Sequence, residues 1–421
     1  MRAISKEKVA LSLKIKRAYA RFYPSRFSSF YGVGRDYSFS IRTAATGYQK
    51  LYLELMKKPL SSGFFLVYFC RMKLHRLLFI LLISAAFLNA CSNGNASGDV
   101  IVLFQPKYAK GFRVVKTGND TLIQFLTHSD SPAVSHSVSL SKINPERIAL
   151  LSTTHSYFVN TLDGIKNVCG VTYADRIQLE NLQAQIANGK TQNLTTNGNV
   201  NMEELLLLNP TVLFSVPFEP TQYQTKLPNC SVIPTAEYLE EHPLGKAEWI
   251  YVFGYVLRKD VLSNELFLKI EREYLDSAED SSQLRSRKVF FATNNGSDWT
   301  VANNQSYWAI LLKDAGAAYV GAMNDKGNLN FDKERMLFAL NEADAYGELV
   351  YFPNTPYVSL SQLHPEFAQS GPFQHKKIFF CNAADNGFFD KALLEPHILL
   401  QELRMVLSDS TFSGNYFQRT Q

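Results

Sequence analysis

The chain has 421 residues, with 43 Lys or Arg, 38 Asp or Glu and a formal net charge of +5. This charge is unevenly distributed, because residues 1–71 hold 14 basic and 3 acidic side chains, whereas residues 91–421 hold 27 basic and 35 acidic ones. The latter part has a net charge of −8, so its charge argues against nucleic acid or an anionic membrane surface as a partner.

Residues 72–91 read MKLHRLLFILLISAAFLNAC and have the pattern of a secretory signal. A basic head precedes an apolar run from Leu77 to Leu88, and small residues follow it. The run is shorter than the roughly 20 apolar residues that span a bilayer. Ending at Cys91, the segment resembles the lipobox of bacterial lipoproteins. That resemblance implies lipid on Cys91 and a location on the periplasmic side of a bacterial membrane.

Residues 1–71 precede this signal, although an export signal acts from the N-terminus of a chain. They show no coherent core pattern. We therefore expect translation to begin at Met72 and residues 1–71 to be mis-assigned upstream sequence. The alternative is a genuine basic domain that binds nucleic acid.

The 331 residues from Cys91 to Gln421 exceed one typical hydrophobic core and predict two domains. Three cysteines remain beyond Cys91, at positions 169, 230 and 381. Their number is odd, their spacing is wide and no C-x-x-C pattern occurs, so neither a disulfide framework nor a zinc site is predicted.

In chain order, residues 92–140 read as a small polar tether and a β-rich lead-in with short strands. Residues 141–258 alternate short apolar strands with helices, which favours parallel βαβ packing. Residues 259–286 predict one long linker helix, which Asp260 could cap. The βα alternation resumes over 287–421. We therefore predict an α/β fold with two Rossmann-like lobes joined by one rigid helix.

Two glutamates occupy comparable places in the two lobes. Asn201 can cap a helix that contains Glu203 in its first turn, and Asp332 precedes Glu334 in the same way. A helix dipole stabilises a carboxylate there, so both residues have a purely local explanation as well as a functional one.

Five segments in order resemble the periplasmic cobalamin- and iron-siderophore-binding proteins of ABC importers. They are RIALLSTTHSYFVNTLDGIKNVCGVTYADRI, NMEELLLLNPTVLFSV, HPLGKAEWIYVFGYVLRKD, SYWAILLKDAGAAYV and EPHILLQELRMVL. The likeness covers roughly residues 145–410, and Thr211 departs from it where Asp is usual.

The resemblance implies a ligand cleft between the lobes and delivery of the ligand to a membrane permease dimer. It also implies that Glu203 and Glu334 contact arginines of that permease. The expected ligand is a ferric siderophore, and cobalamin and haem remain alternatives.

Ligands of open α/β sheets bind beyond the carboxyl ends of the strands. The candidate ligand-binding residues are therefore those that follow predicted strands: Thr153, Thr154, His155, Tyr173, Trp299 and Phe389. Hydroxyls at a helix start can bind an anionic group, and aromatic rings can support flat ligands. Each residue has an ordinary alternative, because threonines cap helices and loop aromatics pack on their own lobe.

Enzyme motifs are missing from the sequence after Cys91. It contains no G-x-S-x-G, P-loop, G-x-G-x-x-G or H-x-x-x-H pattern. We therefore predict no catalytic residues, no cofactor and no protein-held metal. The alternatives from other classes are a lipid-anchored α/β hydrolase or transferase and a structural lipoprotein.

Overall fold

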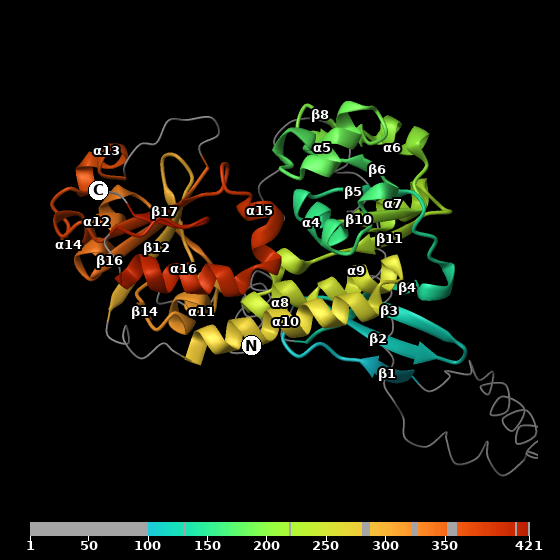
Figure 1. The fold of residues 1–421 in the computed structure, drawn as a ribbon, viewed down its shortest axis with the longest axis horizontal. Coiled ribbons are helices and arrows are strands. Elements are labelled where there is room, and N and C mark those ends of the chain that lie inside the picture. The colour runs from blue at the N-terminus through green and yellow to red at the C-terminus, as the bar shows by residue number, and fades with distance from the viewer. Residues whose placement is uncertain are drawn as a thin grey trace, which may run out of the picture. The chain divides into compact units, whose positions relative to one another are not determined.

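The computed structural model describes residues 100–128, 131–218, 220–279, 287–321, 327–351, 360–408 and 411–419. Cys91, the predicted signal and residues 1–71 lie outside this part. The described residues form a small β-sheet, two α/β lobes and a helical connection (Figure 1). No helix among them is both long and apolar enough to cross a membrane.

The lead-in is a four-stranded antiparallel sheet in which neighbouring strands are consecutive in sequence. Its strands are β1 (Val100–Phe104), β2 (Phe112–Thr117), β3 (Asp120–Leu126) and β4 (Val134–Ser139). The rings of Phe112 and Phe125 pack on Trp249, with ring centroids 5.0 and 6.2 Å away. The sheet therefore shares a hydrophobic core with the helices that follow the N-terminal lobe.

Two buried carboxylates bind the loop between β1 and β2. Glu248 accepts hydrogen bonds from the backbone N–H groups of residues 107, 108 and 109, each at 2.7 Å. Glu240 accepts from the backbone N–H groups of residues 110 and 111 and from the indole of Trp249. Because the loop's donors are satisfied by side chains far away in sequence, the lead-in is held by tertiary contacts.

The N-terminal lobe has a parallel five-stranded sheet in the order β11-β10-β5-β6-β7. The strands are β5 (Ile148–Leu150), β6 (Val168–Val171), β7 (Gln192–Asn193), β10 (Val212–Ser215) and β11 (Ser231–Pro234). The helices are α4 (Thr153–Thr161), α5 (Glu180–Ala187), α6 (Met202–Leu208) and α7 (Pro220–Lys226), and β8 (Thr195–Thr196) pairs with β9 (Asn199–Val200).

The connection between the lobes contains α8 (Pro243–Glu248), α9 (Ile250–Leu257) and α10 (Asp260–Glu279). The segment HPLGKAEWIYVFGYVLRKD, residues 242–260, reads as one helix in sequence, but the structure divides it into α8 and α9 at Trp249. The ring of Trp249 is fully buried and donates a hydrogen bond to Glu240. Helix α10 lies within the predicted linker range of 259–286. It buries Phe267, Ile270 and Tyr274 along one face.

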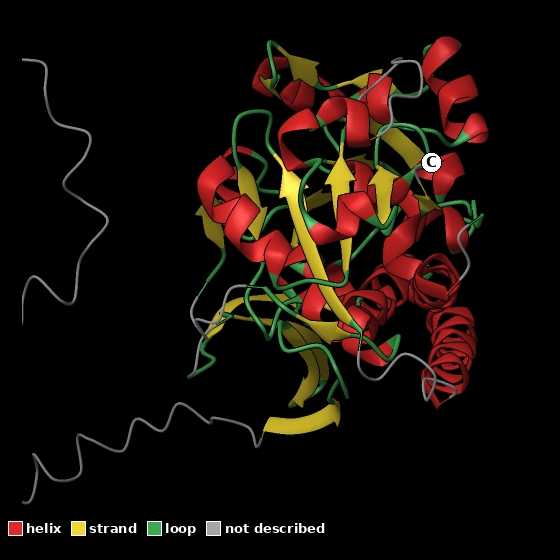
Figure 2. Cartoon of the chain, turned by 90° about the vertical axis from the view of Figure 1, so that its left-hand side faces the viewer, coloured by secondary structure: helices red, strands yellow, loops and turns green. Residues whose placement is uncertain are grey.

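The C-terminal lobe has a mixed seven-stranded sheet in which β12, β14, β16 and β17 are parallel. Its strands are β12 (Lys288–Asn294), β13 (Trp299–Val301), β14 (Ala318–Tyr319), β15 (Leu329–Phe331), β16 (Ala345–Val350), β17 (Ile378–Asn382) and β18 (Gln418–Arg419). Its helices are α11 (Tyr307–Asp314), α12 (Lys333–Asn341), α13 (Leu360–Leu363), α14 (Gly371–Gln374), α15 (Phe388–Lys391) and α16 (Pro396–Ser408). Figure 2 shows strands of this lobe lying between helices.

One hydrophobic core continues from the lead-in through α9 and α10 into both lobes. Stacked rings of Phe158, Phe253 and Phe214 join α4, α9 and β10, with centroids 4.4–4.6 Å apart. Because interiors packed in this way deform little, the core couples both lobes to the connecting helices. The predicted α/β fold of two lobes joined by a long helix is confirmed.

Candidate functional site

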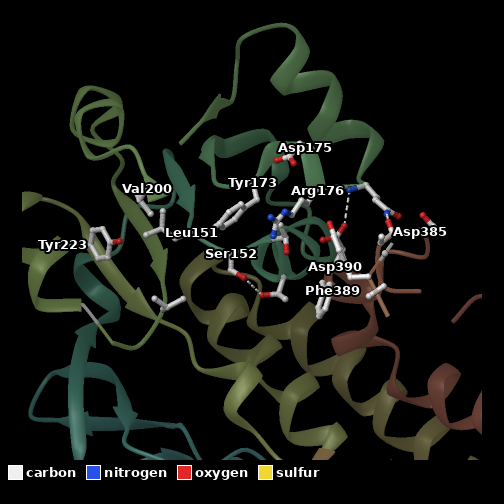
Figure 3. A pocket seen from close by; sticks show the side chains of 18 residues that line it. Leu151, Ser152, Tyr173, Asp175, Arg176, Val200, Tyr223, Asp385, Phe389 and Asp390 are labelled. Atoms are coloured by element: carbon white, nitrogen blue, oxygen red, sulfur yellow. Dashed lines mark hydrogen bonds between the residues drawn. The ribbon is translucent and has the colours of Figure 1, made fainter. Parts of the chain in front are cut away.

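A cavity of about 860 Å³ lies between the two lobes (Figure 3). Its lining includes a residue just beyond the carboxyl end of each of five parallel strands. These residues are Leu151, Tyr173, Val216, Tyr351 and Ala383, which follow β5, β6, β10, β16 and β17. This is the position where open α/β sheets bind ligands, and the volume is in the range of ligand pockets.

Hydroxyl groups form the floor of the cavity where β5 leads into α4. Ser152, Thr153 and Thr154 line it. The hydroxyls of Ser152 and Thr154 are 2.9 Å apart, and Thr154 donates to Oε1 of Glu237 at 2.7 Å. The alternative that Thr153 or Thr154 caps the helix is wrong, because α4 already begins at Thr153 with Ser152 at the cap position. The free N–H groups of the first turn therefore lie beside these hydroxyls.

Tyr173 is held in the cavity by an unusual backbone conformation. Its φ of 51° lies in the left-handed region, which is costly for a bulky side chain. Its backbone N–H donates to the hydroxyl of Thr195 at 2.7 Å, and its own hydroxyl donates to the carbonyl of Gly198 at 3.1 Å. The hairpin of β8 and β9 thus fixes the orientation of the ring.

Four charged residues line the cavity that sequence reasoning did not select. They are Asp175, Arg176, Asp385 and Asp390. The guanidinium of Arg176 lies 4.7 Å from the centre of the Tyr173 ring, within the range of a cation–π contact. The Y-A-D-R segment, which closely follows a predicted strand, could have identified Asp175 and Arg176 as candidate ligand-binding residues.

Asp390 belongs to the C-terminal lobe but is bound by the N-terminal lobe. Its Oδ2 accepts a hydrogen bond from the backbone N–H of Gln178 at 3.1 Å, drawn as a dashed line in Figure 3. Burial raises the pKa of the Asp390 carboxyl to about 6, against the opposing effects of Gln178 and Lys391. This carboxylate therefore lies at the contact between the lobes, on the cavity wall.

Aromatic side chains supply the apolar part of the wall in the C-terminal lobe. Phe389 and Tyr351 are both partly exposed, with ring centroids 6.3 Å apart. Phe389 follows β17, as the sequence predicted, and lies in the short helix α15. A ligand-binding role for Phe389, as for Thr153, Thr154 and Tyr173, stays a prediction that its position supports.

His155 and Trp299 are not among the lining residues. His155 is 1% exposed, its Nε2 lies 2.6 Å from the hydroxyl of Thr235, and burial lowers the pKa of its imidazole. Trp299 is 4% exposed, and its indole donates to Oε1 of Glu348 at 3.1 Å. Both side chains pack inside their own lobes, so their positions do not support ligand contact.

Glu203 and Glu334 lie on the surface in the first turns of α6 and α12. Both helices are capped alike, because Asn201 accepts from the backbone N–H of residue 204 and Asp332 from that of residue 335. Four residues after each glutamate stands a strongly exposed apolar side chain, Leu207 at 80% and Phe338 at 75%. The two lobes thus present the same pair of surface groups.

The wall of the cavity combines polar, charged and apolar groups. Hydroxyls, one guanidinium, three carboxylates and aromatic rings surround it. In the described part of the chain, no cluster of three or more His, Cys, Asp or Glu side chains could hold a metal ion. Cys169, Cys230 and Cys381 are buried and free.

The sequence and the structure both match known proteins. Residues 148–340 match the family model described as periplasmic binding protein. The uncharacterized lipoprotein MJ0878 of Methanocaldococcus jannaschii is 22% identical over 280 residues, which cover 64% of this chain and 66% of that protein. The alignment thus spans slightly less than two thirds of that relative.

Solved structures share the fold at low sequence identity. The siderophore binding protein BauB, bound to ferric iron and two molecules of acinetobactin, has a TM-score of 0.51 and 15% identity, over 70% of this chain and 99% of that chain. The periplasmic haem binding protein HutB of Vibrio cholerae has a TM-score of 0.51 and 14% identity, over 63% and 100%. The match over residues 148–340 and the fold shared with these structures agree with the resemblance seen in the sequence: this chain is similar to periplasmic binding proteins.

Proposed function

We propose that this chain is the substrate-binding lipoprotein of an ABC importer, and that it captures a ferric siderophore or a similar metal chelate. Cobalamin and haem are the alternative ligands. The observation that carries the proposal is the cavity of about 860 Å³, which is walled by both lobes at the carboxyl ends of their strands. BauB and HutB, which have this fold, are described as binding a ferric siderophore complex and haem.

Binding in this cavity requires no covalent step. Hydroxyls of Ser152 and Thr153 can hydrogen-bond a chelate, and the rings of Tyr173 and Phe389 can contact its apolar faces. The continuous core between the lobes favours a largely preformed site, which suits a bulky and stiff ligand because little ordering is required on binding.

Calorimetric titration of the purified protein with a ferric hydroxamate, haem and cobalamin tests the proposal. We expect micromolar or tighter binding of one class. Tyr173→Ala should weaken this binding at least about tenfold, whereas Phe338→Ala, which changes an exposed aromatic on α12 outside the cavity lining, should leave it unchanged. Absence of binding to all three classes would overturn the proposal.

The delivery step is proposed to use Glu203 and Glu334. A matching carboxylate on each lobe suits a permease with twofold symmetry, because arginine–carboxylate pairs are directional. The exposed Leu207 and Phe338, one helical turn beyond these glutamates, would add apolar contact area to such an interface.

A further inference from the structure

We propose that the cavity selects metal chelates that are neutral or positively charged and rejects polyanionic chelates. This inference rests on the proposed function and narrows its ligand class. Its basis is the charge of the wall, where the described lining residues include three carboxylates and one guanidinium. With every group ionised, the wall carries two negative charges in excess.

The two lobes contribute unequally to this charge. The N-terminal lobe supplies Asp175 and Arg176, which are adjacent and of opposite sign. The C-terminal lobe supplies Asp385 and Asp390, and no cation from that lobe is among the described lining residues. The ammonium of the neighbouring Lys391 lies 5.7 Å from the centre of the Tyr416 ring, and Lys391 is not among those lining residues. Lys391 acts on Asp390 and lowers the pKa of that carboxyl, but among the lining residues themselves the excess negative charge belongs to the C-terminal lobe.

Arg176 is already engaged within the protein. Its guanidinium lies over the Tyr173 ring at 4.7 Å, and Asp175 is its neighbour in sequence. A single guanidinium in this setting cannot balance a ligand with several negative charges as well as the carboxylates around it. Moving unpaired like charges into a partly desolvated cavity is costly, because the reduced dielectric strengthens their repulsion.

Two stretches next to lining residues lie outside the described part of the chain and contain no basic side chain. Residues 352–359, which follow Tyr351, contain neither Lys nor Arg, and position 219, close in sequence to Val216, is a glutamate. Wherever they lie, they bring no Lys or Arg that could offset the carboxylates of the wall.

Hydrogen-bonding capacity points to the same ligand class. Ionised carboxylates only accept hydrogen bonds, whereas the Ser152 and Thr153 hydroxyls can donate or accept. Such a wall suits a ligand that carries N–H or ammonium donors. A ferric tris-hydroxamate is neutral, because three singly charged hydroxamates balance the ferric ion, and a free amine on the ligand makes it a cation. A ferric tris-catecholate keeps three negative charges, and haem carries two propionates.

The test compares three chelates by calorimetry, at matched ionic strength and at a pH well above the pKa of Asp390. They are a cationic ferric tris-hydroxamate with a free amine, a neutral cyclic ferric tris-hydroxamate and a ferric tris-catecholate. We expect both hydroxamates to bind at least about tenfold more tightly than the catecholate. Added salt should weaken binding of the cation most, because screening removes its attraction to the wall.

Variants of the cavity carboxylates test whether the charge of the wall, and not the shape of the cavity, determines which chelate binds. The double variant Asp385→Asn and Asp390→Asn should lower affinity for the cationic chelate several-fold and raise affinity for the catecholate. Asp276→Asn removes a carboxylate from the exposed surface of α10 and should change neither affinity. Thermal melts identify any variant that fails to fold, and for such a variant Asp385→Asn alone gives the same comparison.

Two results would overturn the inference. One is tighter binding of the catecholate than of both hydroxamates in the unmodified protein. The other is an unchanged ratio of affinities in a folded Asp385→Asn variant. Either result would leave the proposed binding function standing, whereas failure of hydroxamates, catecholate, haem and cobalamin alike to bind would remove that function itself.

Discussion

The hydroxyl of Tyr157 donates a hydrogen bond to Oε1 of Glu395 across 2.8 Å. Tyr157 lies on α4 of the N-terminal lobe, and Glu395 directly precedes α16 of the C-terminal lobe. The other carboxylate oxygen of Glu395 accepts from the hydroxyl of Tyr416. Two residues 238 positions apart thus connect the lobes through a charged acceptor.

Tyr157→Phe should lower the free energy of unfolding by about 1.5–3 kcal/mol, the usual contribution of a hydrogen bond to a charged group. Tyr251→Phe is the control, because it removes a bond to the neutral side chain of Asn264 and should cost about 0.5–1.5 kcal/mol. Urea unfolding curves measure both values. Equal stability of Tyr157→Phe and the parent protein would show that the bond between the lobes contributes nothing.

Glu248→Ala should detach the lead-in sheet. The change removes the acceptor of three backbone N–H groups, those of residues 107–109, of which that of residue 109 is buried. An unsatisfied buried donor costs about 1–3 kcal/mol. We expect faster proteolysis within residues 100–140 and a lower unfolding free energy. Glu241→Ala is the control, because its exposed pair with Lys110 contributes only about 0–1 kcal/mol. Identical protease resistance in both variants would contradict the assigned role of Glu248.

Asp390 should make stability depend on pH. Burial raises the pKa of its carboxyl from 3.8 to about 6, so the folded protein binds this proton more tightly than the unfolded chain does. The stabilisation that comes from this tighter proton binding is therefore fully present below 3.8, the pKa in the unfolded chain, and is lost as the pH rises through about 6. Between these values, the parent protein should lose stability relative to Asp390→Asn. Parallel pH profiles of the two proteins in denaturant titrations would show that the pKa is not raised.

Glu203→Arg combined with Glu334→Arg should abolish uptake of the ligand and leave its binding unchanged. Each exposed ion pair contributes only about 0.2–1 kcal/mol, so the expected role is orientation on the permease. Glu180→Arg with Glu342→Arg makes the same charge change at one exposed site in each lobe and should preserve uptake. Loss of ligand binding in the first pair would place those glutamates in the site or the core, and normal uptake would leave them as helix-start carboxylates.

Cys91→Ala should release the protein from the membrane fraction. A single acyl chain gives only marginal membrane binding, whereas the diacylglycerol expected on a lipoprotein cysteine supplies two chains. Fractionation followed by immunoblotting measures the distribution, and Cys230→Ala, a change at a buried cysteine, serves as the control. Full retention of Cys91→Ala on the membrane would contradict the lipobox assignment.

The strands could be predicted from the sequence because the local pattern of apolar residues agrees with the buried position of each strand in the folded protein. Apolar runs such as those of β5, β10 and β17 are buried on both faces in parallel sheets, so they appear in sequence as short continuous hydrophobic segments. The cap at Asn201 was equally local, since its side chain binds a backbone N–H only three residues away. The carboxyl ends of the strands then indicated where Tyr173 and Phe389 would lie.

Other features depend on partners that the local sequence does not indicate. Trp299 begins a strand and is buried because Glu348, 49 residues later, accepts its indole N–H. The helical segment is interrupted at Trp249, whose ring packs against Phe112 of the lead-in sheet, more than 100 residues earlier. Likewise, the charge of the cavity arises only when Asp385 and Asp390 of one lobe face Arg176 of the other.

The sequence alone therefore determined most of the order of helices and strands, the two α/β lobes and the edge of the sheets at which the cavity lies. Each depends on hydrophobic periodicity or on contacts within a few residues. The tertiary structure decided which side chains reach the cavity, which pack in a core and how the lead-in is held. Burial and charge balance are properties of groups brought together from distant positions, so no single segment of the chain carries them.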